Sequence, residues 1–311
     1  VRSLAAAGYR EIVLTGVQIS AYRSGEHRLD SLVRALLAAL EDPGHPEDPE
    51  EVRAAPRLRL TSIAPWDIDS RLLALWSDPR LCRHLHLSLQ SGSTATLARM
   101  RRPYSAAAFA RVVAQVRRAV PGVAITTDVI AGFPGETAAE FAESIALVTE
   151  MRFAKVHVFP FSPRPGTAAA SLPDPVGPDE RRERVERLLA VAADSEREFW
   201  RANLGHRATV LWERPRRGFG HGLTDNYVRV FCSAGAGLWN RSSEVLLVSL
   251  ALGGVLGELV PRSAPPGNGV IACGAGQPSH VPAPPVSGGR GTEGQPIQDL
   301  VQPEFGQPHE A

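Results

Sequence analysis

The sequence predicts an α/β protein with a parallel sheet, followed by a small all-β domain. Two observations support this prediction. Over the first two-thirds of the 311 residues, short apolar or alternating runs are separated by stretches in which apolar residues recur at helical spacing. After about residue 206, short strand-like runs are separated by glycine-rich turns, with no helical spacing between them. Strands that alternate with helices favour a parallel sheet.

Five strands are expected in the first part, over residues 11–16, 57–63, 84–90, 123–130 and 155–161. Helices are expected between them, over residues 29–40, 68–76, 105–120 and 138–151. Asp67 or Asp69 would cap the second of these helices and Ser105 the third. The repeated pattern fits either a barrel or an open doubly wound sheet. No Gly-x-Gly-x-x-Gly follows the first strand, which argues against a dinucleotide-binding fold.

The second part begins with a long charged helix over residues 179–203. Four strands follow, over residues 208–213, 227–231, 244–250 and 256–260, and they predict a barrel of about 55–60 residues. From residue 262 onward, 9 prolines and 9 glycines fall in 50 residues without periodicity, which predicts a disordered tail. The expected domains are therefore residues 1–203, 204–261 and 262–311.

Composition limits the function classes. With 34 Lys and Arg against 33 Asp and Glu, the net charge of +1 excludes nucleic-acid binding by bulk charge, so any RNA site must be a local patch. No run reaches the roughly 20 apolar residues of a membrane helix. Cys82, Cys232 and Cys273 are too scattered for a disulfide framework or a local metal motif, so we expect a reducing cytoplasm. The chain has no signal peptide and opens without methionine inside a predicted helix, so we expect a fragment.

Polar residues follow nearly every predicted strand of the first part. In parallel α/β proteins, ligands lie at the carboxyl ends of the strands. Alternation along the predicted strand places His86, Ser88 and Gln90 on one face of the sheet. Burying serine and glutamine in the interior of a barrel is costly unless these groups form hydrogen bonds with a ligand or water. Asp128 lies in an apolar strand and needs a hydrogen-bond partner. His84, His86 and His157 predict no metal centre, because no further cysteine or histidine completes a ligand set.

Four segments carry a family resemblance. They are Ile63-Ala-Pro-Trp-Asp67, Arg83-His-Leu-His-Leu-Ser-Leu-Gln-Ser-Gly-Ser93, Thr127-Asp-Val-Ile-Ala-Gly-Phe-Pro-Gly-Glu136 and His157-Val-Phe-Pro-Phe-Ser-Pro-Arg-Pro-Gly-Thr167. In this order and spacing they resemble the radical S-adenosylmethionine (SAM) methylthiotransferases, with the tRNA threonylcarbamoyladenosine branch closest. The segment from Gly222 to Arg229 resembles the TRAM domain that ends these enzymes. The resemblance covers about residues 1–261.

The resemblance implies a partial radical SAM (β/α)6 barrel followed by a small TRAM barrel. It implies SAM as cofactor, and 4Fe–4S clusters in the full-length parent only, because the three cysteines match none of the family's ligand positions. It also implies the tRNA anticodon stem-loop as partner, a reductant for the parent's cluster, and no membrane or DNA partner. The parent would transfer a methylthio group to C2 of a modified adenosine, and no catalytic residue is assigned within this chain.

By the same resemblance, the expected cofactor contacts are Gly16, Gln18, Ser62, Ser88, Gln90, Thr127 and Asp128. The expected RNA contacts are Arg164, Arg207, Arg216, Arg217, Tyr227 and Arg229, with arginines on phosphates and the tyrosine stacked on a base. For Arg164 a structural turn competes with a phosphate contact. Arg99 fits a solvated helix end equally well, while Arg101 or Arg102 could face the cofactor carboxylate or the tRNA backbone.

Two function classes remain open. The first is an enzyme fragment of the threonylcarbamoyladenosine branch, with the isopentenyladenosine branch as runner-up and a branch acting on a ribosomal protein less favoured. The second is a non-catalytic tRNA-binding module built from a barrel remnant and a TRAM barrel. A Cys-x-x-x-Cys-x-x-Cys encoded upstream of Val1 would separate them.

Overall fold

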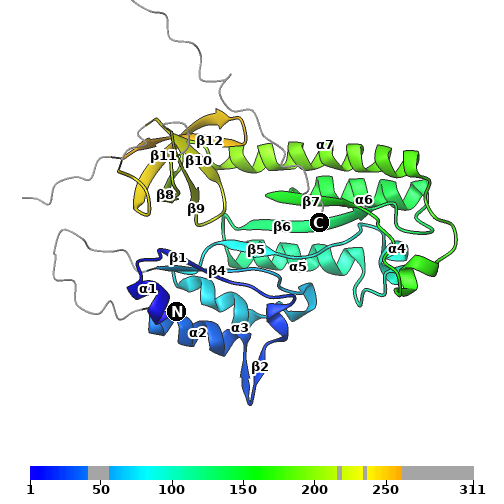
Figure 1. Cartoon of the computed structure of the whole chain (residues 1–311), viewed down its shortest axis with the longest axis horizontal. Helices are drawn as coiled ribbons and strands as arrows, with labels where there is room; N and C mark the ends of the chain where they lie inside the picture. Colours follow the sequence, from blue (N-terminus) through cyan, green and yellow to red (C-terminus); the bar gives the residue numbers. More distant parts are fainter. Residues whose placement is uncertain (41–55, 216–218, 234–236, 261–311) are drawn as a thin grey trace, which may run out of the picture. The chain divides into compact units, whose positions relative to one another are not determined.

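The computed structural model describes residues 1–40, 56–215, 219–233 and 237–260. Its first part is the predicted α/β region, shown in Figure 1. Its strands are β1 (Glu11–Leu14), β4 (Arg57–Leu60), β5 (His84–His86), β6 (Ala124–Ala131) and β7 (Lys155–Pro160). Its main helices are α1 (Arg2–Ala6), α2 (Leu29–Ala39), α3 (Ser70–Leu73), α4 (Thr94–Arg99), α5 (Ala106–Ala119), α6 (Ala138–Met151) and α7 (Pro178–Asn203). A two-stranded ribbon, β2 (Arg23–Ser24) with β3 (His27–Arg28), precedes α2.

The five long strands are parallel, as predicted. β1 pairs with β4, β5 with β6, and β6 with β7, all in parallel register. Parallel bridges from Leu58 to Leu81 and from Ile63 to Leu87 join β4 to the segments flanking β5. The strand order is therefore the chain order, β1-β4-β5-β6-β7, and the carboxyl ends of the strands lie at one edge of the sheet.

Local sequence signals account for the helix boundaries. Asp69 caps α3, where its Oδ1 accepts a hydrogen bond from the Leu72 amide at 2.8 Å. Ser105 caps α5 in the same way, accepting from Ala108. Thr137 and Glu140 form a capping box that starts α6 at the expected residue. The predicted helix over 68–76 is shorter in the structure, because the α-helical turn of α3 passes into a 3-10 helix, Ala74–Ser77.

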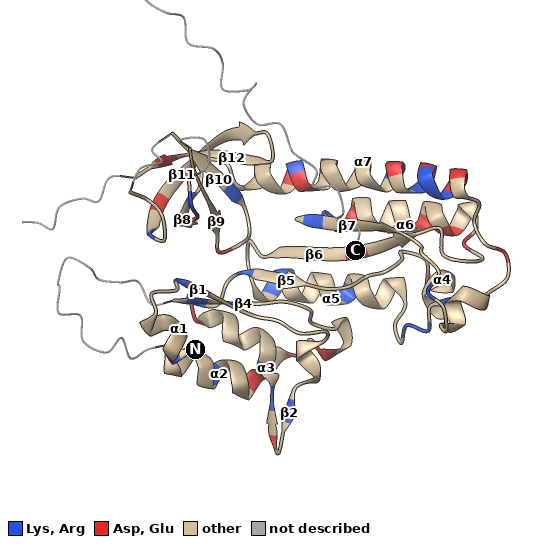
Figure 2. Cartoon of the chain, in the orientation of Figure 1, with Lys and Arg blue, Asp and Glu red and all other residues tan. Residues whose placement is uncertain are grey.

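Helices cover one face of the sheet and bury its apolar residues. Leu85, Leu87, Leu89 and Val129 are fully buried in a core that includes residues of α5, α6 and α7. Helix α7 packs on β6 and β7 and on α6. Basic and acidic residues are interspersed along α7, so its exposed face carries no single sign of charge (Figure 2).

The second part is a closed five-stranded barrel, as predicted. It consists of β8 (Arg207–Trp212), β9 (Gly220–Thr224), β10 (Arg229–Cys232), β11 (Ser242–Ala251) and β12 (Gly254–Leu259), in the order β10-β12-β11-β8-β9. Its own core contains Val210, Trp212, Val230 and Val245. Residues from Val1 to Leu259 form one compact unit. The predicted disordered tail lies outside the described residues.

Strand β9 was not predicted, and the strand expected over 227–231 begins two residues later. A glycine-rich segment is typical of a turn, so the sequence does not indicate a strand at β9. A Cβ on Gly222 would lie 2.3 Å from the Leu211 carbonyl oxygen. The barrel wall therefore needs a residue without a side chain at this position. Tyr227 has φ of +66° and belongs to the turn between β9 and β10.

None of the helices in the described part of the chain combines the length and the apolar character that a membrane span requires.

Candidate functional site

The loops after β1 and β4 hold three of the expected cofactor residues. Gly16 is exposed directly after β1, and a Cβ there would lie 3.3 Å from the side chain of Ile19. Gln18 donates from Nε2 to Asp67 Oδ2 at 3.2 Å, which ties the first loop to the Ile63–Asp67 motif. Ser62 has φ of +58°, an uncommon conformation for a residue with a side chain, and its carbonyl accepts from the Ile19 amide at 3.2 Å. The two loops therefore form one connected rim.

Ser88 and Gln90 follow β5 at the same edge. The Ser88 hydroxyl lies 3.4 Å from His86 Nε2, and its carbonyl accepts from the Tyr104 hydroxyl at 2.8 Å. Gln90 has φ of +70° and is only 9% exposed. Its backbone bonds to β6 on both sides, which fixes the Gln90 residue at the end of the sheet.

Thr127 and Asp128 point to opposite faces of β6. Thr127 is fully buried, and its hydroxyl donates to the Leu87 carbonyl at 2.6 Å and accepts from the Leu89 amide at 2.9 Å. Both bonds hold the segment after β5 in place, so this hydroxyl already has two backbone partners. Asp128 faces the other way, and its Oδ2 lies 3.2 Å from His86 Nε2. The hydrogen-bond partner that the sequence requires for Asp128 is therefore His86.

A polar network extends from this aspartate across the sheet. Thr126 Oγ1 lies 3.0 Å from His86 Nδ1 and 3.2 Å from His84 Nε2. His157, on β7, is the register partner of Asp128 and joins the same cluster. Burial lowers the pKa of His157, and burial with the nearby Arg59 charge lowers the pKa of His84 to about 3, so both rings are neutral near pH 7. The sequence grouped His84, His86 and His157 but predicted no metal centre, and it did not show that Asp128 joins them, because only the strand register brings these residues together.

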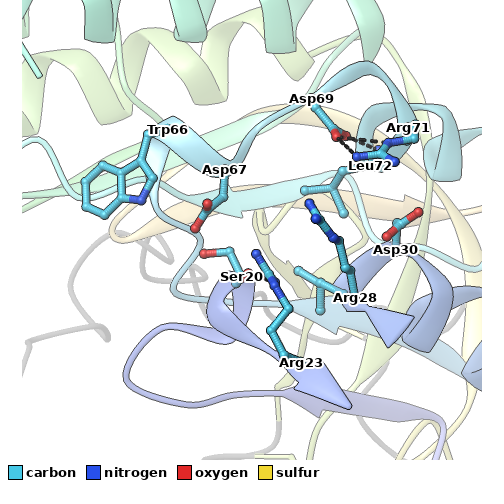
Figure 3. Close-up of a pocket in the computed structure, with 10 residues that line it drawn as sticks. Ser20, Arg23, Arg28, Asp30, Trp66, Asp67, Asp69, Arg71 and Leu72 are labelled. Carbon is cyan, nitrogen blue, oxygen red and sulfur yellow. Dashed lines mark hydrogen bonds and ion pairs between the residues drawn. The ribbon is translucent and has the colours of Figure 1, made fainter. Parts of the chain in front are cut away.

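A pocket lies beside the rim formed by the first two loops, and Figure 3 shows its lining side chains. Arg23, Arg28 and Arg71 line it together with Trp66 and three aspartates. Arg71 pairs with Asp69 at 3.0 Å, whereas Arg23 donates only to backbone carbonyls. Arg28 has no acidic partner within the part of the chain that the structure describes. Two guanidinium groups are thus available to an anionic group in this pocket.

The described cysteines do not fit an iron–sulfur cluster. Cys82 and Cys232 are both buried, one beside the parallel sheet and the other in the barrel core. Burial raises the pKa of the Cys82 thiol to about 12.

Four of the six expected RNA contacts lie within the described residues, namely Arg164, Arg207, Tyr227 and Arg229. Arg164 is exposed in a turn where its carbonyl accepts from Thr167. Arg207 lies 3.6 Å from Glu244, and Arg229 lies 3.8 Å from Glu213. Arg216 and Arg217 lie outside the described residues.

Tyr227 packs against the α/β part of the unit. Its ring stacks on His84 with centroids 4.6 Å apart, and the Arg59 guanidinium lies 5.0 Å from the ring centre. The tyrosine is still 40% exposed. The base-stacking role expected for this ring must therefore use a face that these two residues leave open, and sequence spacing gave no signal of the contact.

Ion pairs around Tyr227 fix the turn between β9 and β10 against the sheet. Asp225 receives two hydrogen bonds from Arg83, at 2.6 and 3.0 Å. Arg59, only 2% exposed, binds Glu11 and donates to the carbonyls of Thr224 and Asp225. Burial alone would raise the pKa of Glu11, but Arg59 and Arg57 outweigh it and hold that pKa below its ordinary value.

Comparison with known proteins gives the family. Residues 1–148 match the radical SAM superfamily. The threonylcarbamoyladenosine tRNA methylthiotransferase MtaB of Bacillus subtilis is 37% identical over 238 residues, which are 74% of this chain and 50% of that protein. The tRNA-2-methylthio-N(6)-dimethylallyladenosine synthase of Geobacter sulfurreducens is 36% identical over 266 residues, or 84% of this chain and 57% of that protein.

The chain thus matches the radical SAM superfamily over residues 1–148 and is similar to tRNA methylthiotransferases over most of its length. It spans about half the length of the curated relatives it matches. Among solved structures, coproporphyrinogen III oxidase (HemN) of Escherichia coli, a radical SAM enzyme, matches with a TM-score of 0.46 at 16% identity, covering 60% of this chain and 40% of that one. The radical SAM superfamily implies SAM and 4Fe–4S clusters as cofactors.

Proposed function

We propose that the chain is the radical-domain and RNA-binding part of a tRNA methylthiotransferase that adds a methylthio group to C2 of threonylcarbamoyladenosine, next to the anticodon. The observation that carries the proposal is its 37% identity over 238 residues to the Bacillus subtilis protein named for that substrate. The branch acting on dimethylallyladenosine is the second candidate, because relatives with that name match at 35–40% identity.

The rim of polar residues fits SAM. Gln90 and Ser62 offer an amide and a hydroxyl at this rim, and both residues have a positive φ that the sheet edge imposes. Bound SAM supplies the radical and the methyl group in this family. The residues of this chain would orient it and keep water out. Because the described cysteines do not fit a cluster, we assign the cluster to the full-length parent and expect this chain alone to be inactive.

The arginine-lined pocket favours the threonylcarbamoyl substrate over the dimethylallyl one. A threonylcarbamoyl group carries a carboxylate, whereas a dimethylallyl group is apolar. Arg23 and Arg28 form no ion pair among the described residues and line the pocket together with Trp66 and the three aspartates (Figure 3). Guanidinium groups bind carboxylates through paired, charge-assisted hydrogen bonds.

A chimera tests the proposal. The matching segment of the Bacillus subtilis enzyme is replaced by residues 1–260 of this chain, in a strain that lacks the native gene, and tRNA nucleosides are measured by mass spectrometry. We expect 2-methylthio-threonylcarbamoyladenosine, and a lower yield with Arg23→Gln plus Arg28→Gln. Methylthiolation of dimethylallyladenosine alone, in this chimera or in a matched one with the Geobacter enzyme, would reassign the substrate. A folded chimera without either product supports the non-catalytic RNA-binding alternative.

The five-stranded barrel is proposed to bind the tRNA through arginine–phosphate contacts. Affinity should fall with salt, with each contact adding about 0.7–0.9 to the slope of log affinity against log salt. Replacing Arg216 and Arg217 by alanine should reduce the slope by about 1.4–1.8 if both contact phosphate. Replacing Glu258, an exposed acidic residue of β12, by glutamine is the control and should not reduce it. An unchanged slope in the folded double variant would remove this pair from the RNA site.

A further inference from the structure

Three side chains that can ligate a metal meet on one face of the sheet. They are His86 from β5, Asp128 from β6 and His157 from β7. The register explains the meeting, because His157 is the partner of Asp128, and His86 is the partner of Thr126, two residues before Asp128. One ligand atom from each residue lies within 4.8 Å of the other two. This face is the one opposite the fully buried Thr127 and Val129.

The spacing of these atoms suits a coordinated cation. His86 Nε2 and Asp128 Oδ2 are 3.2 Å apart. Two ligands that each lie about 2.1 Å from an ion, at angles between right-angled and tetrahedral, are separated by about 3.0–3.4 Å. The pair therefore already has the separation of two ligands on one ion. A small movement of the half-exposed His157 ring would bring in the third.

The surroundings of His86 fix its ring as they do in metal sites. His86 Nδ1 lies 3.0 Å from Thr126 Oγ1, so the tautomer with a proton on Nδ1 donates to that hydroxyl and leaves a lone pair on Nε2. The threonine hydroxyl then donates to His84 Nε2, 3.2 Å away. The two hydrogen bonds could also run the opposite way, from His84 through Thr126 to His86. In both arrangements the buried Nδ1 of His84 has no partner, so the arrangement that suits a cation leaves no additional atom unpaired.

We propose that His86, Asp128 and His157 bind one divalent transition-metal cation. Two imidazoles and one carboxylate favour Zn²⁺ or Fe²⁺ over Mg²⁺ or Ca²⁺, which prefer oxygen ligands. Because His157 is exposed, the remaining coordination positions are open to water or a ligand, and the Ser88 hydroxyl lies beside them. The site needs only these side chains and does not rest on the proposed function.

Cation binding to the chain itself tests the proposal. The chelator-treated chain is titrated with Zn²⁺ by calorimetry, and with Co²⁺ while visible absorption is followed. We expect one site whose Co²⁺ spectrum is that of nitrogen and oxygen ligands without thiolate. His157→Ala and Asp128→Asn should abolish this binding phase, and Thr126→Val, which removes the support of His86, should weaken it by about 10-fold to 100-fold.

A matched control uses a histidine outside the cluster. His206 is exposed before β8, and His206→Ala should bind as the unmodified chain does. Circular dichroism verifies that each variant is folded, and His157→Ala carries the test if Asp128→Asn does not fold, since His157 is exposed. Equal affinity in the unmodified chain and in His157→Ala would place the cation elsewhere and overturn the proposal. Absence of binding by the unmodified chain would overturn it as well, leaving a simple hydrogen-bonded cluster.

Discussion

At the scale of single residues, the most consequential charges are those the fold buries. Glu136 and Arg184 lie between the loop after β6 and helix α7, with side chains 1% and 5% exposed and an ion pair of 2.7 Å between Oε2 and Nη1. Arg184 also binds Glu180, and Glu136 accepts from the Gly132 amide at 2.8 Å. Burial raises the pKa of Glu136 despite these partners. Glu136 thus fixes the loop after β6 against helix α7.

The first prediction concerns this pair. Arg184→Met should lower the free energy of unfolding by about 3–5 kcal/mol near pH 7, because it leaves a buried carboxylate without its counter-charge. Urea unfolding measures the change. The control is Arg182→Met on the same helix, where both members of the pair with Asp179 are exposed, and it should cost less than about 1 kcal/mol. Similar losses in the two variants would mean that burial of the pair has no special weight.

At the scale of elements, the sequence predicts those whose signals are local. Helix α6 has the expected bounds because Thr137 and Glu140 cap it and its apolar residues repeat at helical spacing. Strand β9 could not be predicted, because its glycines are required by contacts with a strand ten residues earlier. The candidate site divides in the same way. Polar residues after strands were visible in the sequence, but the joining of His86, Asp128 and His157 depends on strand register.

The second prediction concerns the contact between the loop after β5 and helix α6. A Cβ on Gly92 would lie 2.5 Å from the Cα of Ser144, whose hydroxyl accepts from the Gly92 amide at 3.0 Å. Gly92→Ala must push the loop and helix apart, so we expect a loss of about 1–3 kcal/mol in the free energy of unfolding. Gly177→Ala, where a Cβ meets nothing within 4 Å, should cost less than about 1 kcal/mol. A neutral Gly92→Ala would show that the helix yields freely.

At the scale of the whole unit, acidic groups connect the parallel sheet to the barrel. Glu11 binds Arg57 and Arg59, which in turn donate to carbonyls of the turn after β9, and Asp225 in that turn binds Arg83. Burial would raise the pKa of both carboxyls, but the arginines outweigh it and lower both. Sequence alone showed basic and acidic residues in each part. It gave no sign that they pair across the two parts.

The third prediction is a pH dependence of stability that comes from this contact. Because the folded pKa values of Glu11 and Asp225 lie below the ordinary values of 4.5 and 3.8, the unfolded chain binds more protons as pH falls through this range. Their contribution is therefore present above about pH 4.5 and is lost as pH falls through the folded pKa values. Urea unfolding at a series of acidic pH values should show this decline. Asp225→Asn should reduce the slope of this decline by up to about 1.4 kcal/mol per pH unit, since one titrating group is removed.

The control Asp179→Asn alters an exposed carboxylate at the start of α7 and should leave the slope nearly unchanged. If Asp225→Asn retains the full slope while folding normally, titration of Asp225 does not contribute to the pH dependence, and its ion pair with Arg83 adds no measurable stability.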